Sequence, residues 1–276
     1  MSLLTAVSRE APFRSVLCAA LKVAYKLTPS AFRWAAYFDA IPYVHYAVGL
    51  ARAAEFAALF GIRSFSAIEL GVAGGNGLMW LSKHARSVST QTGMTIRVAG
   101  FDNATGLPPI ADWRDAPWVY SPGEYPCDVD ALTKRLGRSE LVLGDIAETL
   151  PEWLAQGHAP VGFLAVDVDY YSSAIAGLKA LGSAAPQALL PICESYFDDI
   201  LCRGMPRFAG EFAAIAEFNK SNSHRQFDRD DSLGEWRPFS ERLWLKRMYS
   251  FYCLDHPLMQ THRQRQPRGL DLVDAS

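Results

Sequence analysis

Carboxylates recur in one kind of place in this 276-residue chain, at the end of a short apolar run. Five such runs are predicted strands, and each has an acid at or directly after its end. If the strands are parallel in one sheet, these acids meet at its carboxyl edge, where open α/β sheets bind ligands. One such Asp could simply cap the next helix, but five acidic strand ends indicate a site. The acids are Glu69, Asp102, Asp145, the pair Asp167 and Asp169, and the pair Asp198 and Asp199.

The first of these acids precedes a glycine-rich turn. Glu69 is followed by Gly71, Gly74, Gly75 and Gly77, and then by an apolar helical run. Glycine permits a sharp turn and lets a ligand approach where a Cβ would block it. Phosphate loops offer N–H groups to anions, so a carboxylate at this loop favours a cationic or hydroxyl-bearing ligand such as S-adenosylmethionine (SAM). A dinucleotide loop is disfavoured because the third glycine of G-x-G-x-x-G is missing.

An alternation of strands and helices must position these groups. Residues 12–62 are expected to be helical, and the strands that follow are apolar runs without clean alternation, as expected when helices cover both faces. The pattern predicts an α/β fold with a doubly wound, Rossmann-like sheet, mostly parallel with an antiparallel C-terminal strand. Strands are expected at 66–70, 95–101, 140–143, 161–166 and 188–197, helices at 76–88, 128–136, 147–155, 172–182 and 208–219, and a final strand pair within 242–252.

The chain is expected to divide into an N-terminal helical extension (1–62), a SAM-binding domain (63–256) and a C-terminal tail (257–276). Residues 103–126 contain five prolines and two tryptophans, and are too long for an ordinary βα connection. They are either a lid or substrate wall, or a well-packed surface loop. The N-terminal helices could cap the site or form a dimer face, which leaves a homo-oligomer open.

Composition restricts the classes of function. The formal net charge is −2 and the pI is about 6.3. The chain therefore lacks the excess of basic residues that is typical of nucleic-acid-binding proteins. No apolar run approaches the roughly 18 residues needed to span a bilayer. The five cysteines lack CxxC spacing, which favours free thiols in a reducing compartment. We therefore expect a cytoplasmic protein that binds neither nucleic acid nor membrane.

Five motifs, in order, resemble those of the class I SAM-dependent methyltransferases, and among them the macrocin O-methyltransferase family. The resemblance covers roughly residues 60–200. This chain lacks the Gly-Gly that the family commonly has before the fifth strand, so Glu194 stays open as an alternative to Asp198 and Asp199. The motifs are ELGVAGG at 69–75, GFDNATGLP at 100–108, GDIAETLP at 144–151, DVDYYSS at 167–173 and YFDD at 196–199.

The resemblance implies a role for each matched residue. Asp102 would accept both ribose hydroxyls, because a carboxylate can accept two hydrogen bonds, and Asp145 and Ile146 would flank the adenine. For Asp145, capping of the next helix is an equally open explanation. In the family, acids that match Asp167, Asp198 and Asp199 bind magnesium, which prefers carboxylate oxygens, and Asp169 matches the proposed base. The remaining implied cofactor contacts are Glu69, Gly71, Val72, Gly74 and Gly75 for the amino-acid end of SAM, together with Asp167.

The sequence therefore predicts a SAM-dependent O-methyltransferase that acts, with magnesium, on a hydroxyl of a small-molecule or glycosidic acceptor. Two other classes remain as alternatives. A non-catalytic SAM-binding or scaffold protein would bind SAM without turnover or metal. A nicotinamide-dependent oxidoreductase would be stabilised against heat by NAD and not by SAM. No motif identifies the acceptor.

Overall fold

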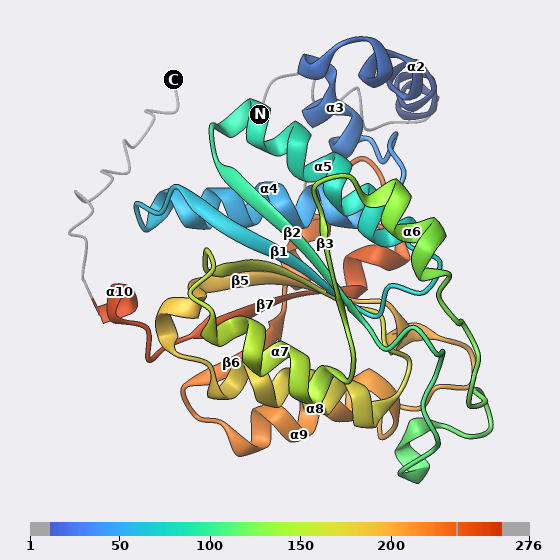
Figure 1. Cartoon of the computed structure of the whole chain (residues 1–276). Helices are drawn as coiled ribbons and strands as arrows, with labels where there is room; N and C mark the ends of the chain where they lie inside the picture. Colours follow the sequence, from blue (N-terminus) through green and yellow to red (C-terminus); the bar gives the residue numbers. More distant parts are fainter. Residues whose placement is uncertain (1–11, 236, 261–276) are drawn as a thin grey trace, which may run out of the picture.

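A computed structural model of the chain describes residues 12–235 and 237–260. Seven strands form one sheet in the order β3-β2-β1-β4-β5-β7-β6 (Figure 1). The first five strands run parallel, and β7 lies antiparallel between β5 and β6. This confirms the predicted fold class. The strands are β1 (Ser64–Leu70), β2 (Thr95–Asp102), β3 (Glu140–Leu143), β4 (Val161–Val166), β5 (Leu189–Phe197), β6 (Arg225–Arg229) and β7 (Met248–Cys253).

Helices cover both faces of the sheet. α4 and α5 lie on one face, and α7, α8 and α9 lie on the other (Figure 1). Every residue of β4 is buried between these layers. Within the described ranges, no helix combines the length and the apolar character needed to cross a bilayer. The α-helices are α2 (Phe13–Leu27), α3 (Phe32–Tyr37), α4 (Val44–Leu59), α5 (Asn76–Thr92), α6 (Val129–Leu136), α7 (Ile146–Ala155), α8 (Tyr171–Ser183), α9 (Gly210–Ser221) and α10 (Pro257–Gln260), and the 3₁₀ helices are η1 (Pro29–Ala31), η2 (Trp113–Asp115), η3 (Pro186–Ala188), η4 (Asp199–Leu201), η5 (Asp231–Gly234) and η6 (Leu243–Arg247).

The predicted strand pair within 242–252 is wrong in its first half. Residues 243–247 form η6, and only β7 is a strand. The partner of β7 is β6, which the sequence did not indicate. β6 reads RQFDR and contains one apolar residue, Phe227. A five-residue strand with one apolar side chain lacks the alternation by which strands are recognised, and pairing with β7 decides its structure.

α4 packs directly on the sheet, although it falls within the expected N-terminal extension. Gly49 lies against the ring of Phe163 on β4, where an added Cβ would approach the ring to 2.2 Å. Residues from α3 to β7 belong to one hydrophobic core. The domain boundary at residue 62 stays a prediction, and residues 1–11 of the extension and 261–276 of the tail lie outside the described residues.

Candidate active site

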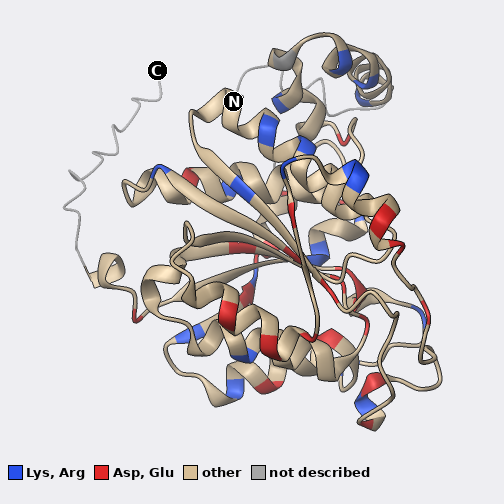
Figure 2. Cartoon of the chain, viewed as in Figure 1, with Lys and Arg blue, Asp and Glu red and all other residues tan. Residues whose placement is uncertain are grey.

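A pocket opens at the carboxyl edge of the sheet. It is bounded by the loop after β1, the ends of β2 and β4, the start of α7 and the loop 103–126. Figure 2 shows that acidic residues collect in the region where the parallel strands end. Among the predicted site residues, Gly71, Asp102, Ile146, Asp167 and Asp169 line the pocket.

The loop after β1 requires glycine at position 71. Its φ is +83°, and a Cβ there would lie 1.8 Å from the backbone oxygen of Asp167. Gly74 differs, because a Cβ at this position would meet no described atom within 4 Å. The loop therefore packs tightly against the end of β4 at Gly71 and leaves its backbone open to a ligand at Gly74.

Asp102 holds this loop in place. Its Oδ2 accepts hydrogen bonds from the backbone N–H groups of Val72 and Ala73, both at 2.8 Å, and its Oδ1 accepts one from Ala104 at 2.6 Å. A carboxylate has about four acceptor sites, so three are already used by the backbone. The ribose contact stays a prediction, and the structure adds a role that the sequence did not indicate, which is to fix the conformation of the glycine loop.

Glu69 is buried behind the loop. The hydroxyl of Tyr46 on α4 donates to its Oε1 at 2.5 Å, and Oε2 has no donor among the described residues. Burial raises the pKa of Glu69 to about 8, against the opposing effect of the Tyr46 hydrogen bond. A Cβ at Gly77 would lie 2.0 Å from Oε1, so this glycine makes room for the carboxylate. Tyr46 lies outside every motif that the sequence analysis singled out, so its role was missed.

The two residues expected near the adenine, Asp145 and Ile146, have different positions at the start of α7. Asp145 is the N-cap of α7, and its Oδ1 accepts a hydrogen bond from the Ala147 N–H at 2.8 Å. Ile146 lines the pocket. Asp145 therefore caps α7. Contact of either residue with adenine stays a prediction.

The three acids expected to bind a metal lie together. One carboxylate oxygen each from Asp167, Asp198 and Asp199 lie within 4.8 Å of one another. Asp199 is 5% exposed, and its Oδ2 is buried without a hydrogen-bond donor in the part of the chain that the structure describes. Asp167 opens to the cleft, yet loss of bulk water around its carboxylate, followed by the charges of Asp198 and Asp199, raises its pKa well above the ordinary value. Such a cluster fits a divalent cation, because clustered carboxylates repel one another until a cation or shared protons compensate.

Glu194, the alternative ligand, lies elsewhere. It is buried within β5, three residues before the strand ends. It forms an ion pair with Arg52 at 2.9 Å and accepts a hydrogen bond from Ser250 at 3.1 Å. The structure therefore brings Asp198 and Asp199, and not Glu194, to Asp167.

Asp169 stands on a tight turn beside this cluster. Its φ is +60°, and the Tyr170 N–H donates to the Val168 carbonyl at 2.5 Å. Burial and then the charge of Asp199 raise the pKa of Asp169 to about 7. A carboxyl group that titrates near neutral pH is suited to accept a proton.

Side chains from distant segments complete the surroundings of the acids. The hydroxyl of Tyr120 donates to Asp199 at 3.1 Å, and Arg247 donates to Asp198 at 2.6 Å. Arg247 immediately precedes β7, and the antiparallel direction of β7 places it beside the end of β5. A strand pair was expected within 242–252, and this expectation did not place Arg247 at this edge.

The loop 103–126 was expected to be either a lid or substrate wall or a well-packed surface loop, and each description fits part of it. Leu107 and Tyr125 line the pocket, so the loop forms a wall of the site. Ala116 and Tyr120 pack in a small core with Tyr170 and Ala209, the residues that directly precede α8 and α9. Its two tryptophans are more than half exposed on the outside. The loop is thus a packed wall whose inner side faces the pocket.

Comparisons with known proteins yield structural similarities only. No protein-family model matches the chain, and no curated protein matches it. Similar solved structures include CalS11, a calicheamicin methyltransferase (23% identity, TM-score 0.46, 62% of this chain and 69% of that one covered), and an O-methyltransferase from Bacillus cereus in complex with SAH, S-adenosylhomocysteine (13% identity, TM-score 0.38, 74% and 80% covered). A third is the O-methyltransferase TomG from Streptomyces achromogenes in complex with SAM (14% identity, TM-score 0.37, 73% and 77% covered). Similarity at this level does not assign an activity, so the function has to be argued from the site.

Proposed function

We propose that this protein is a SAM-dependent O-methyltransferase that acts, with the help of magnesium, on a hydroxyl group of a small-molecule or glycosidic acceptor. One observation carries the proposal. The pocket beside the glycine loop is lined by Gly71 and Asp102 and also by Asp167 and Asp169. A cavity suited to the cofactor therefore opens directly onto carboxylates suited to the chemistry.

The cofactor would occupy the side of the pocket near the glycine loop. Gly71 to Gly75 would contact its amino-acid end, and Asp102 its ribose. The buried Oε2 of Glu69, which has no donor in the described chain, would complement the positive charge of the amino group. SAM supplies a methyl group already activated by its sulfonium centre, so the protein has to align the acceptor and manage one proton.

Asp167, Asp198 and Asp199 would hold the magnesium ion. The buried, unpartnered Oδ2 of Asp199 supports this assignment, as does the grouping of the three carboxylates. Bound magnesium would lower the pKa of an acceptor hydroxyl in contact with it. Asp169 lines the same pocket and would accept the hydroxyl proton, and the tight turn closed by the Tyr170 N–H fixes the backbone that carries it.

Calorimetry with SAM, NAD and magnesium, followed by transfer of labelled methyl from SAM to candidate hydroxyl compounds, tests this function. The proposal predicts SAM binding, magnesium binding and methyl transfer that an Asp169→Asn variant loses. SAM binding without transfer or metal would support the non-catalytic alternative. Heat protection by NAD and not by SAM would support the oxidoreductase alternative.

A further inference from the structure

The segment 167–172 carries two of the site acids on a strained turn. Asp169 has a left-handed backbone, and the Tyr170 N–H closes a three-residue turn onto Val168 at 2.5 Å. Tight turns with a left-handed central residue are uncommon and persist only where the surrounding structure holds them. The contacts on either side of Asp169 therefore show what fixes the site.

Glu211 holds this segment from α9. It is fully buried in the first turn of that helix. Its Oε2 accepts a hydrogen bond from the Asp199 N–H at 3.0 Å, and its Oε1 accepts a longer one from the Val168 N–H at 3.5 Å. One carboxylate thus joins the backbone after β4 to the backbone after β5, and these two backbones carry the clustered acids.

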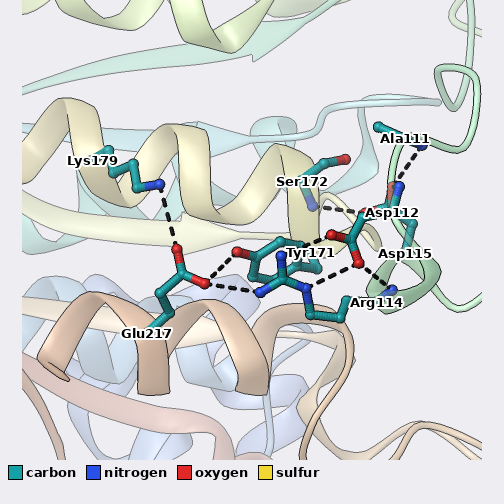
Figure 3. A network of polar contacts seen from close by, with 8 residues as sticks. All are labelled: Ala111, Asp112, Arg114, Asp115, Tyr171, Ser172, Lys179 and Glu217. Atoms are coloured by element: carbon teal, nitrogen blue, oxygen red, sulfur yellow. Dashed lines mark hydrogen bonds and ion pairs between the residues drawn. The ribbon is translucent and has the colours of Figure 1, made fainter. Parts of the chain in front are cut away.

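Asp115 holds the segment from the opposite end, out of the loop 103–126. It is fully buried, and its Oδ1 accepts a hydrogen bond from the Ser172 N–H at 2.8 Å, at the start of α8 (Figure 3). Its Oδ2 accepts bonds from the N–H groups of Ala111 at 3.0 Å and Asp112 at 3.1 Å. Hydrogen bonds from backbone N–H groups to a carboxylate are among the stronger ones. Asp115 therefore joins its own loop to α8.

We propose that Glu211 and Asp115 are positioning residues, which fix the segment 167–172 from its two sides and so set where Asp169 stands relative to Asp167 and Asp199. The inference rests on the proposed function, because it assigns these two residues to the geometry of that site. Neither lines the pocket, so both act through the backbone that they hold. A displacement of about 1 Å in a reacting group can reduce a rate about 100-fold, which makes this restraint consequential.

Two nearby acids provide matched controls. Glu217 also lies on α9, where it accepts hydrogen bonds from the Tyr171 hydroxyl at 2.6 Å and from Arg114 at 2.9 Å (Figure 3). Asp112 lies in the same loop as Asp115, and its carboxylate binds the Arg114 guanidinium. Conversion of either acid to its amide makes the same chemical change in the same element, but alters no hydrogen bond to the backbone of 167–172.

The test compares Glu211→Gln and Asp115→Asn with Glu217→Gln and Asp112→Asn in the full chain. Calorimetry measures the affinities for Mn²⁺ and for SAM, and hydrogen exchange measures the protection of 167–172. We expect the first two variants to bind Mn²⁺ at least about 10-fold more weakly than the wild type, as when supporting partners of metal ligands are lost. Their affinity for SAM should stay within about twofold of the wild-type value. Exchange should accelerate in 167–172 alone, and the controls should behave as the wild type.

A role confined to general stability would lower the melting temperature but leave the Mn²⁺ affinity of the folded protein unchanged. Wild-type Mn²⁺ affinity and wild-type exchange in both variants would overturn the inference. If the wild type binds SAM but no Mn²⁺, the metal part of the proposed function fails, and exchange in 167–172 alone decides whether the two acids position the turn. If Glu211→Gln does not fold, Asp115→Asn carries the same test from the opposite side.

Discussion

The glycine loop after β1 and the acid cluster after β4 and β5 form two halves of one site, yet they are built differently. In the first half, Asp102 is bound by backbone N–H groups of the loop beside it and of its own turn. In the second, Asp199 is bound by the side chains of Tyr120, in the loop 103–126, and Glu211, on α9. The first half is therefore held by backbone N–H groups at the ends of β1 and β2, and the second by side chains from other elements.

Each half keeps one buried carboxylate oxygen without a donor in the described ranges, on Glu69 and on Asp199. Their surroundings differ. In the protein without SAM, burial raises the pKa of Glu69 to about 8, and an ammonium group placed beside it would favour its ionised form. Asp199 has Asp167 and Asp198 beside it, and of these three acids Arg247 pairs with Asp198 alone. In the first half the oxygen without a donor therefore belongs to a single carboxyl group, and in the second it belongs to a member of a cluster.

The largest expected effect is a loss of magnesium affinity when the acid cluster is altered. The double substitution Asp198→Asn and Asp199→Asn removes two of the three grouped carboxylates, so we expect magnesium affinity to fall by more than about 100-fold. SAM affinity should stay within about threefold of the wild type, because neither residue lines the pocket. Calorimetry measures both, with Glu152→Gln on the exposed side of α7 as the control. Unchanged magnesium affinity would refute the metal assignment.

Asp102→Ala tests the other half. It removes the acceptor of three backbone hydrogen bonds, so the glycine loop loses its support and the ribose loses its expected partner. Hydrogen bonds to charged groups contribute about 1.5–3 kcal/mol each, and we expect SAM affinity to fall about 10- to 100-fold while magnesium affinity is retained. If SAM affinity stayed at its wild-type value, both the ribose assignment and the role in the loop would be wrong.

The same division explains how much could be predicted from the sequence. The acids at the ends of β1 to β5 follow apolar runs of ordinary length, and the sheet places them at one edge, as expected from the alternation of strands and helices. The direction of parallel strands predicts that these acids meet at one edge, whereas the grouping of Asp167, Asp198 and Asp199 as metal ligands came from the resemblance. Their carboxylate oxygens lie within 4.8 Å of one another, and metal binding stays a prediction.

The supporting residues could not be predicted in the same way. Tyr46, Glu211 and Arg247 reach the acids through the packing of α4 on the sheet, the position of α9 and the antiparallel entry of β7. None of these contacts leaves a local spacing in the sequence. β6 was missed for a related reason, since its strand structure depends on pairing with β7. Long-range packing decides these features, and a single sequence does not show it.

Two glycines of the first half should respond in opposite ways to alanine. A Cβ at Gly77 would meet Glu69 at 2.0 Å, whereas one at Gly74 would meet no described atom within 4 Å. We expect Gly77→Ala to destabilise the protein without SAM by about 1–3 kcal/mol through overpacking. Gly74→Ala should leave that stability within about 0.5 kcal/mol of the wild type, and it should weaken SAM binding if SAM approaches the loop at Gly74 as the resemblance implies. Denaturant unfolding and calorimetry measure the two quantities.

If Gly74→Ala bound SAM as tightly as the wild type, the cofactor would not approach the loop at this position. If Gly77→Ala were fully stable, the carboxylate of Glu69 could move away, and its place behind the loop would not be fixed. Either result would weaken the view that the first half is preformed.

The last expected effect is a pH dependence that arises from Glu69. In the folded protein without SAM its pKa is about 8, above its ordinary value in an unfolded chain, so the folded state holds a proton that the unfolded state releases between these pKa values. Stability from this group is therefore present at low pH and is lost as the pH rises through about 8, with a slope of at most about 1.4 kcal/mol per pH unit. Glu69→Gln cannot titrate and should lack this slope. Denaturant unfolding from pH 5 to 9 measures the difference, and an identical slope in both proteins would show that Glu69 is ionised in the folded state.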